Sequence, residues 1–211
     1  MAAVTDFYFT AQEAKDYISK TDAADDAKIK RMAATISRLY EARTHQFFTK
    51  DAAVVNRIFW GDGTSCLRVC GQNNVPGIAS TSGLVVTIDR DNDGSFADET
   101  AVSSSDYELR PLHAALGPQA APWKEIVLHG LGSPTDTYWP RGYRVQVTAM
   151  FGWPAVPDSV KENCLALFDI WWNRDPRGAG ISDLDTVIAR NPQALSLMKK
   201  IEQLHYEPVF A

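Results

Sequence analysis

Apolar residues recur at helical spacing at both ends of the chain. Near the N-terminus, Thr10-Ala11-Gln12-Glu13 has the capping-box pattern, in which the Thr hydroxyl and the Glu carboxylate each satisfy a free backbone amide. It predicts a short helix that ends near Lys20. A second helix is expected to start at Thr21 or Asp22, because an apolar stripe about 25 residues long follows at helical spacing. The stripe comprises Ile29, Met32, Ala33, Ile36, Leu39, Tyr40 and Phe47.

Two further helices are expected after Pro157. The third carries an apolar stripe at i, i+4, i+7, i+8 and i+11, and Asp175-Pro176 ends it. Asn191-Pro192 starts the fourth, because Asn can cap a helix and Pro suits its first position. The third stripe is Val160, Cys164, Leu167, Phe168 and Trp171, and the fourth is Leu195, Met198 and Ile201.

Between these helices, short β-rich runs alternate with segments rich in Gly, Pro, Asn and Ser. This spacing predicts an antiparallel β sandwich or small barrel, with loops at 72–82 and 130–142. Four tryptophans supply bulky material for its core or rim: Trp60, Trp123, Trp139 and Trp153. The expected strands are Val54–Trp60, Cys66–Val69, Leu84–Ile88, Tyr107–Leu109, Ile126–Leu128 and Arg144–Ala149.

The fold class is therefore α+β. One description is a single α+β domain, and the other is a helical bundle with the β region inserted between its second and third helices. We favour the second, because the two apolar helices that flank the insertion each need a partner. The expected domains are a helical bundle with a C-terminal tail, 1–52 plus 155–211, and a β-rich insertion, 53–154.

The composition is that of an ordinary globular protein: of 211 residues, 45% are hydrophobic and 22% are charged. The net charge of −5 argues against a general electrostatic clamp for nucleic acid. No apolar run is long enough for a bilayer, and no secretory signal pattern is present, so no membrane partner is expected. An odd number of cysteines, Cys66, Cys70 and Cys164, favours free thiols in a reducing compartment.

The closest match to a metal-binding motif is Asp89-Arg90-Asp91-Asn92-Asp93-Gly94. Carboxylates at positions 1, 3 and 5 with Gly at 6 resemble a calcium loop. Thr100 stands where that loop needs a bidentate Glu, Glu99 is one residue early, and a strand precedes the motif. A tight turn is the favoured interpretation, and Asp89, Asp91 and Asp93 are a weak metal candidate.

No pattern of catalytic or cofactor-binding residues is visible. The histidines are scattered singly: His45, His113, His129 and His205. Gly130-Leu131-Gly132-Ser133-Pro134 lacks the last Gly of a nucleophile elbow, and Gly61-Asp62-Gly63-Thr64-Ser65 lacks the Lys of a phosphate loop. We expect no catalytic residue, no cofactor and no enzyme activity.

Trp171 and Trp172 are neighbours on the third helix, so only one of them can face the bundle core. Trp172 either packs under the β insertion or lies in an interface with another subunit. Trp172 and Arg174 are the candidate subunit-interface residues.

The order of several sequence strings carries a resemblance to a known family. ISRLYEART at 36–44 is followed by RIFWG at 57–61, the DRDNDG turn, YELRP at 107–111 and GYRVQVTAMFGWPAVP at 142–157, which runs into the helix that holds Trp171, Trp172 and Arg174. In this order they resemble the head–tail connector (adaptor) proteins of tailed bacteriophages and gene transfer agents, in the long form that carries a β insertion. The resemblance covers about residues 10–205, and 145–157 is its most specific part.

The resemblance implies a structural virion protein, at the head–tail junction of the particle and in the host cytoplasm during assembly. Members of the family form a ring, commonly a dodecamer, on the portal protein, extend the DNA channel and carry a stopper or tail protein. Double-stranded DNA passes through without sequence-specific binding, and an acidic chain would repel it. The family has no catalytic residues.

In that family the C-terminal segment reaches the portal. Here the corresponding portal-binding candidates are Lys199 and Lys200 of the last helix and the tail residues Tyr206, Pro208, Val209 and Phe210. An alternative function, which the residues alone leave open, is a β module on a helical frame that binds calcium or carbohydrate.

Overall fold

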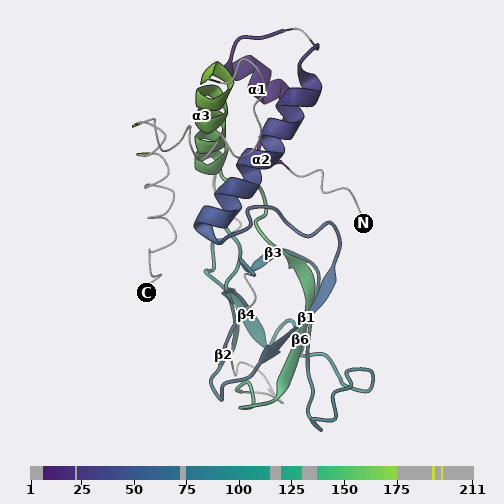
Figure 1. Cartoon of the computed structure of the whole chain (residues 1–211). Coiled ribbons are helices and arrows are strands. Elements are labelled where there is room, and N and C mark those ends of the chain that lie inside the picture. Colours follow the sequence, from purple (N-terminus) through teal and green to yellow (C-terminus); the bar gives the residue numbers. More distant parts are fainter. Residues whose placement is uncertain are drawn as a thin grey trace. The chain divides into compact units, whose positions relative to one another are not determined.

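The computed structural model describes residues 7–21, 23–71, 75–114, 120–129 and 137–174, together with Pro192 and Ser196. These residues form a mixed α+β protein, as the sequence predicts (Figure 1). The described residues up to Gln46 and those from Val156 onward form one compact unit, and Phe47–Ala155 form the other. The helices are α1 (Ala11–Tyr17), α2 (Asp26–Thr44) and α3 (Asp158–Arg174). The strands are β1 (Val55–Trp60), β2 (Cys66–Arg68), β3 (Ile78–Ile88), β4 (Tyr107–Arg110), β5 (Glu125–Leu128) and β6 (Arg144–Phe151).

The predicted capping box begins α1. The backbone amide of Glu13 donates to the Thr10 hydroxyl at 3.1 Å, and the Thr10 amide donates to the Glu13 carboxylate at 2.7 Å. The other oxygen of Glu13 accepts from Lys161 of α3 at 2.8 Å. Glu13, which completes the capping box, therefore also links α1 to α3.

The second helix begins later than predicted, at Asp26 and not at Thr21 or Asp22. Asp25 is the residue before the helix, but its carboxylate pairs with Lys20 and makes no capping hydrogen bond. This contact with Lys20 lowers the pKa of Asp25. The helix ends at Thr44, because His45 adopts a left-handed conformation with φ 52°. Phe47 therefore lies outside the helix, where 44% of it is exposed.

Aromatic side chains hold the helical unit together. Tyr8 meets Tyr40 of α2 edge to face at 6.1 Å between ring centres, and Phe9 meets Phe168 of α3 at 5.7 Å. The Tyr8 hydroxyl also donates to the buried carboxylate of Glu41. The segment before α1 thus packs against both of the longer helices.

The β unit consists of two three-stranded antiparallel sheets, in the orders β1-β6-β3 and β2-β5-β4. Alternate residues of β6 are buried: Val145, Val147, Ala149 and Phe151. The prediction of a loop over 72–82 is wrong from Ile78 onward, because β3 runs from Ile78 to Ile88. Its register against β6 is irregular between Ile78 and Val85, so the first half of β3 lacks the regular apolar alternation that would identify it.

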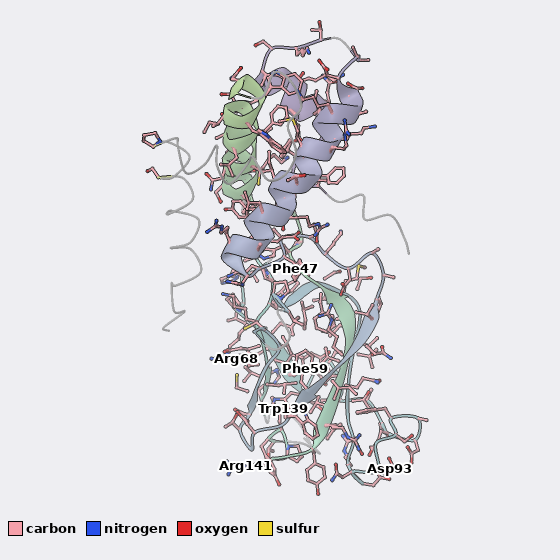
Figure 2. All side chains as sticks on the ribbon, viewed as in Figure 1. Phe47, Phe59, Arg68, Asp93, Trp139 and Arg141 are labelled. Carbon is pink, nitrogen blue, oxygen red and sulfur yellow. The ribbon has the colours of Figure 1, made fainter. Side chains whose placement is uncertain are left out.

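The two sheets enclose one apolar core, in which Phe59 and Trp139 lie (Figure 2). Trp139 is completely buried, and its indole N–H donates to the carbonyls of Ser65 at 3.0 Å and Ile126 at 3.2 Å. Ser65 directly precedes β2, and Ile126 belongs to β5. A residue outside any strand therefore fills the core and satisfies backbone groups of the second sheet. The other tryptophans are less enclosed: Trp123 and Trp153 are half-buried, and Trp60 is exposed.

We expect Trp139→Phe to lower the free energy of unfolding by about 2–3 kcal/mol, because it leaves a cavity and removes a buried donor. Urea unfolding followed by circular dichroism measures the change. Tyr138→Phe is the matched control, since Tyr138 is 56% exposed, and it should leave stability unchanged. Equal stability of the two variants would show that Trp139 does not hold the core.

Candidate functional site

The proposed portal-binding residues Lys199, Lys200, Tyr206, Pro208, Val209 and Phe210 lie outside the described residues. Of the predicted fourth helix, only Pro192 and Ser196 are described, and both are helical and exposed. Arg174 ends α3, but the structure does not describe its side chain. The site residues with a defined geometry are therefore Trp172 and the acidic turn at 89–94.

Trp172 is half-buried within the helical unit. Its ring lies 5.7 Å from that of Phe168, and the ammonium groups of Lys20 and Lys28 lie 4.9 and 4.8 Å from its centre. A cation over the face of an indole is attracted by the ring. A subunit contact at Trp172 would therefore meet a ring that is bordered by positive charge.

The acidic turn brings three carboxylates together. One carboxylate oxygen from each of Asp89, Asp91 and Asp93 lies within 4.8 Å of the others. Asp89 is completely buried, whereas Asp91 and Asp93 are exposed. Figure 2 shows Asp93 on a loop at the periphery of the β unit.

One oxygen of Asp89 already has partners. Its Oδ2 lies 3.0 Å from Nε of Arg144 and accepts from the amide of Gly94 at 3.1 Å. Its Oδ1 is buried and has no hydrogen-bond partner among the described residues. Gly94 has φ 93°, and a Cβ there would come 2.7 Å from the Arg144 guanidinium. The turn is thus built around an Asp–Arg ion pair, and glycine is required where the backbone passes the arginine.

Glu99 holds the other side of the turn. Its carboxylate accepts from the backbone amide of Arg90 at 2.5 Å and from the Arg90 guanidinium at 3.2 Å. Glu99 therefore stabilises the turn through its hydrogen bonds with Arg90. Thr100 takes the position at which a calcium loop has its bidentate Glu. A hard cation could use only Asp91, Asp93 and the free oxygen of Asp89, which is a weak donor set.

The pKa of Asp91 reflects this crowding. The amide of Asp93 donates to Asp91 and lowers the pKa of its carboxyl. Partial desolvation and three neighbouring carboxylates oppose that effect, and the pKa of Asp91 ends above its ordinary value. The three neighbours are Asp89, Asp93 and Asp98.

The β unit also has a pocket of about 230 Å³. Arg57 lines it, with its guanidinium 3.0 Å from Asp51 and 4.7 Å from the centre of the Phe151 ring. The lining contains no histidine and no cysteine: Phe47, Thr49, Lys50, Asp51, Arg57, Pro76, Phe151 and Gly152. Arg57 and Asp51 are thus engaged with each other, and Asp51 also accepts from the amide of Phe151.

The thiols are free and have raised pKa values. Burial raises the pKa of Cys66, Cys70 and Cys164, most strongly for Cys164, which is buried in the helical unit. A thiol with a raised pKa stays protonated at neutral pH and is a poor nucleophile. None of the three has the environment of a reactive cysteine.

Sequence reasoning missed an exposed apolar face on the sheet β1-β6-β3. Ile58 and Trp60 of β1 are 48% and 57% exposed, and Val54 and Val85 are also exposed. The signal was present, because Phe59 is the buried residue and side chains on a strand alternate between faces. Once Phe59 is placed in the core, Ile58 and Trp60 must face outward.

Solved structures include chains that are similar to this one. No protein-family model matches the chain, and no curated protein matches it. A solved structure described as "Neck of empty GTA particle computed with C6 symmetry" contains a chain that is 17% identical, over 92% of this chain and 88% of that chain, with a TM-score of 0.49. Within the described part of the chain, no helix combines the length and apolar character needed to cross a membrane.

We expect Asp91→Asn to raise the melting temperature slightly at pH 7 in the presence of a chelator. The folded-state pKa of Asp91 is raised, so its charged form opposes folding, and Asn removes that charge while it keeps an acceptor for the Asp93 amide. The difference should vanish below about pH 3, where Asp91 is protonated in both the folded and the unfolded chain. Differential scanning calorimetry at the two pH values measures it.

Asp62→Asn is the control with the opposite sign. The side-chain hydroxyl and the amide of Thr64 donate to Asp62 and lower its pKa, so loss of the Asp62 charge should lower the melting temperature at pH 7. The same scans with added calcium test the metal candidate. A calcium-dependent rise for the natural chain that Asp91→Asn abolishes would contradict the interpretation of 89–94 as a turn.

Proposed function

We propose that this chain is a structural virion protein, a head–tail adaptor that assembles as a homo-oligomeric ring on the portal. It extends the DNA channel and provides the docking platform for the stopper or tail. The observation that carries the proposal is the order of the sequence strings along residues 10–205, with 145–157 as the most specific.

The residues of that string have defined roles in the fold. Up to Phe151 they form β6, which pairs with both β1 and β3. Gly152 follows with φ 119°, where a Cβ would come 2.2 Å from the carbonyl of Thr49. The carbonyl of Pro157 then accepts from the amides of Val160 and Lys161 in the first turn of α3. Residues 145–157 thus include most of a central strand, a glycine that the backbone requires and the residues that lead into a helix. These structural roles account for the sequence pattern on which the resemblance rests.

The division of the chain supports the same proposal. Helices α2 and α3 pack together, although the whole β unit separates them in sequence. A helical bundle with a β insertion is what the resemblance leads us to expect of the long form of these adaptors.

Portal binding is assigned to the C-terminal segment in this proposal. Tyr206, Pro208, Val209 and Phe210 make a short, largely apolar peptide, and Lys199 and Lys200 precede it. A peptide of this kind suits docking into a groove or addition to a sheet edge of a partner. Lys199 and Lys200 would form ion pairs with carboxylates at the rim of such a groove.

Two surfaces are candidates for contacts other than the portal. Trp172 and Arg174 on α3 remain the proposed subunit-interface residues. The exposed apolar face of β1, with Ile58 and Trp60, suits a contact with the stopper or tail protein, because aromatic residues are enriched in interfaces. DNA passes the ring without sequence-specific contacts, since a chain with net charge −5 repels it.

A calcium-binding β module is the second candidate function, and the cluster Asp89, Asp91 and Asp93 is the observation that favours it. The ion pair of Asp89 with Arg144 and the engagement of Glu99 by Arg90 weigh against it. The calcium scans described above decide between the two functions.

We expect the purified chain to co-sediment with the portal protein encoded in the same genome, and negative-stain images to show an added ring. A chain truncated after His205 should lose this binding, because it lacks the apolar tail, and should keep its melting temperature. Glu207→Gln, a substitution within the same segment, is the matched control and should bind normally. Portal binding by the truncated chain at the natural level would contradict the assignment of the tail, and absence of binding by the natural chain would contradict the adaptor function.

A further inference from the structure

The face of α2 that points away from the core is basic. Ala27, Arg31, Ala34, Arg38 and Ala42 follow one another at intervals of four, three, four and four residues, so they lie on one side of the helix. Each is exposed or half-buried, whereas the opposite side holds the buried residues of α2. The face contains two arginines and no carboxylate. We call it the basic face.

The outward face of α3 has the opposite charge. Asp158, Glu162, Ala166, Asp169 and Asn173 follow at intervals of four, four, three and four residues, and all are exposed or half-buried. The opposite side of α3 carries the apolar stripe that packs into the helical unit. The outward face contains three carboxylates and no cation. We call it the acidic face.

Apart from Arg38, the charged residues of the two faces take no part in the ion pairs described within the helical unit. Three ion pairs inside the unit match a lysine with a carboxylate: Lys15 with Asp26, Lys20 with Asp25, and Lys161 with Glu13. Among the described residues, the side chains of Arg31 and Glu162 have no hydrogen bond and no salt bridge, and the Arg31 carbonyl accepts from the Thr35 hydroxyl within the helix. Arg38 pairs with Glu41 of its own helix, yet 48% of its side chain is exposed.

The spacing of the charges is the same on both faces. Arg31 and Arg38 are seven residues apart, and so are Glu162 and Asp169, which is about 10.5 Å along a helix axis. When the two faces meet, both arginines can reach a carboxylate at once, whether the helices run parallel or antiparallel. Ala34 and Ala166 lie between the charges, so small side chains occupy the point where the helices would approach most closely.

We propose that the basic face of α2 docks on the acidic face of α3 of a second copy of this chain. Like faces repel, so two copies cannot pair symmetrically through either face alone. In this head-to-tail contact, one copy keeps its acidic face free and the other keeps its basic face free. Further copies can therefore add, which generates a ring if the rotation closes and a filament if it does not. As the lateral contact of the adaptor ring, this pairing rests on the proposed function, and the experiment separates the two.

The test is charge reversal with rescue by mixing. In sedimentation velocity at about 50 mM salt, the natural chain should self-associate, and about 500 mM salt should weaken that association because the charges are exposed. R31E/R38E and E162R/D169R should each weaken self-association by about tenfold or more. An equimolar mixture of the two variants should restore it, because every contact in the mixture again joins opposite charges. Circular dichroism checks that both variants are folded.

R68E/R141E is the matched control, because it makes the same change in net charge at arginines on the surface of the β unit (Figure 2). It should associate like the natural chain. A natural chain that stays monomeric at low salt, or variants that mixing does not rescue, would overturn the proposal. Loss of double-stranded DNA binding by R31E/R38E without any effect on self-association would also overturn it, and would make the basic face a DNA contact.

The same variants on the portal keep the two proposals apart. Rings that form on the portal from R31E/R38E alone or from E162R/D169R alone would leave the adaptor function intact and overturn this contact. Self-association with the expected charge pattern but without portal binding would keep the contact and overturn the adaptor function.

Discussion

The strand β6 is the element on which most of the structure depends. It pairs with β1 on one side and with β3 on the other, and its four buried residues line the core shared by both sheets. At its end, Phe151 accepts from the amide of Asp51, and Gly152 forms a bridge with Lys50. The two places where the chain enters and leaves the β unit are therefore hydrogen-bonded to each other. A short pairing at this point lets the β unit close on itself although its ends belong to a helical unit.

The first residue of β6 sets the charge arrangement at the far end of the sheet. The backbone of Arg144 lies opposite Trp60 of β1 in the sheet. Its side chain forms an ion pair with the buried carboxylate of Asp89, which follows β3. An unpaired carboxylate at that depth would be costly, so the arginine makes the acidic turn possible. The same ion pair occupies one oxygen of Asp89 and leaves only its Oδ1 for a cation. The motif that looks like a metal site in sequence thus has a structural use for its first aspartate.

The sequence predicted the elements that a local pattern defines. The capping box of α1 and five of the strands lie where alternation and punctuation put them. The start of α2 was missed because Asp25 is held by Lys20, a contact that no spacing rule reveals. The first half of β3 was missed because its pairing with β6, and not its own composition, makes it a strand. The sequence left open whether Trp60 belongs to the core or to the rim, and the structure exposes it.

The distribution of charge on the helical unit favours contacts between unlike faces of neighbouring copies. If both outward faces had mixed charge, two copies could pair symmetrically and stop at a dimer. Segregation of arginines on α2 and carboxylates on α3 disfavours pairing through like faces, because like charges would meet, and the proposed contact joins two different faces. The alternation that buries Phe59 leaves β1 with a different kind of surface, which is apolar and nearly uncharged. A directional polar contact and a separate apolar face are what a subunit needs if it is to bind its own copies through one and a different protein through the other.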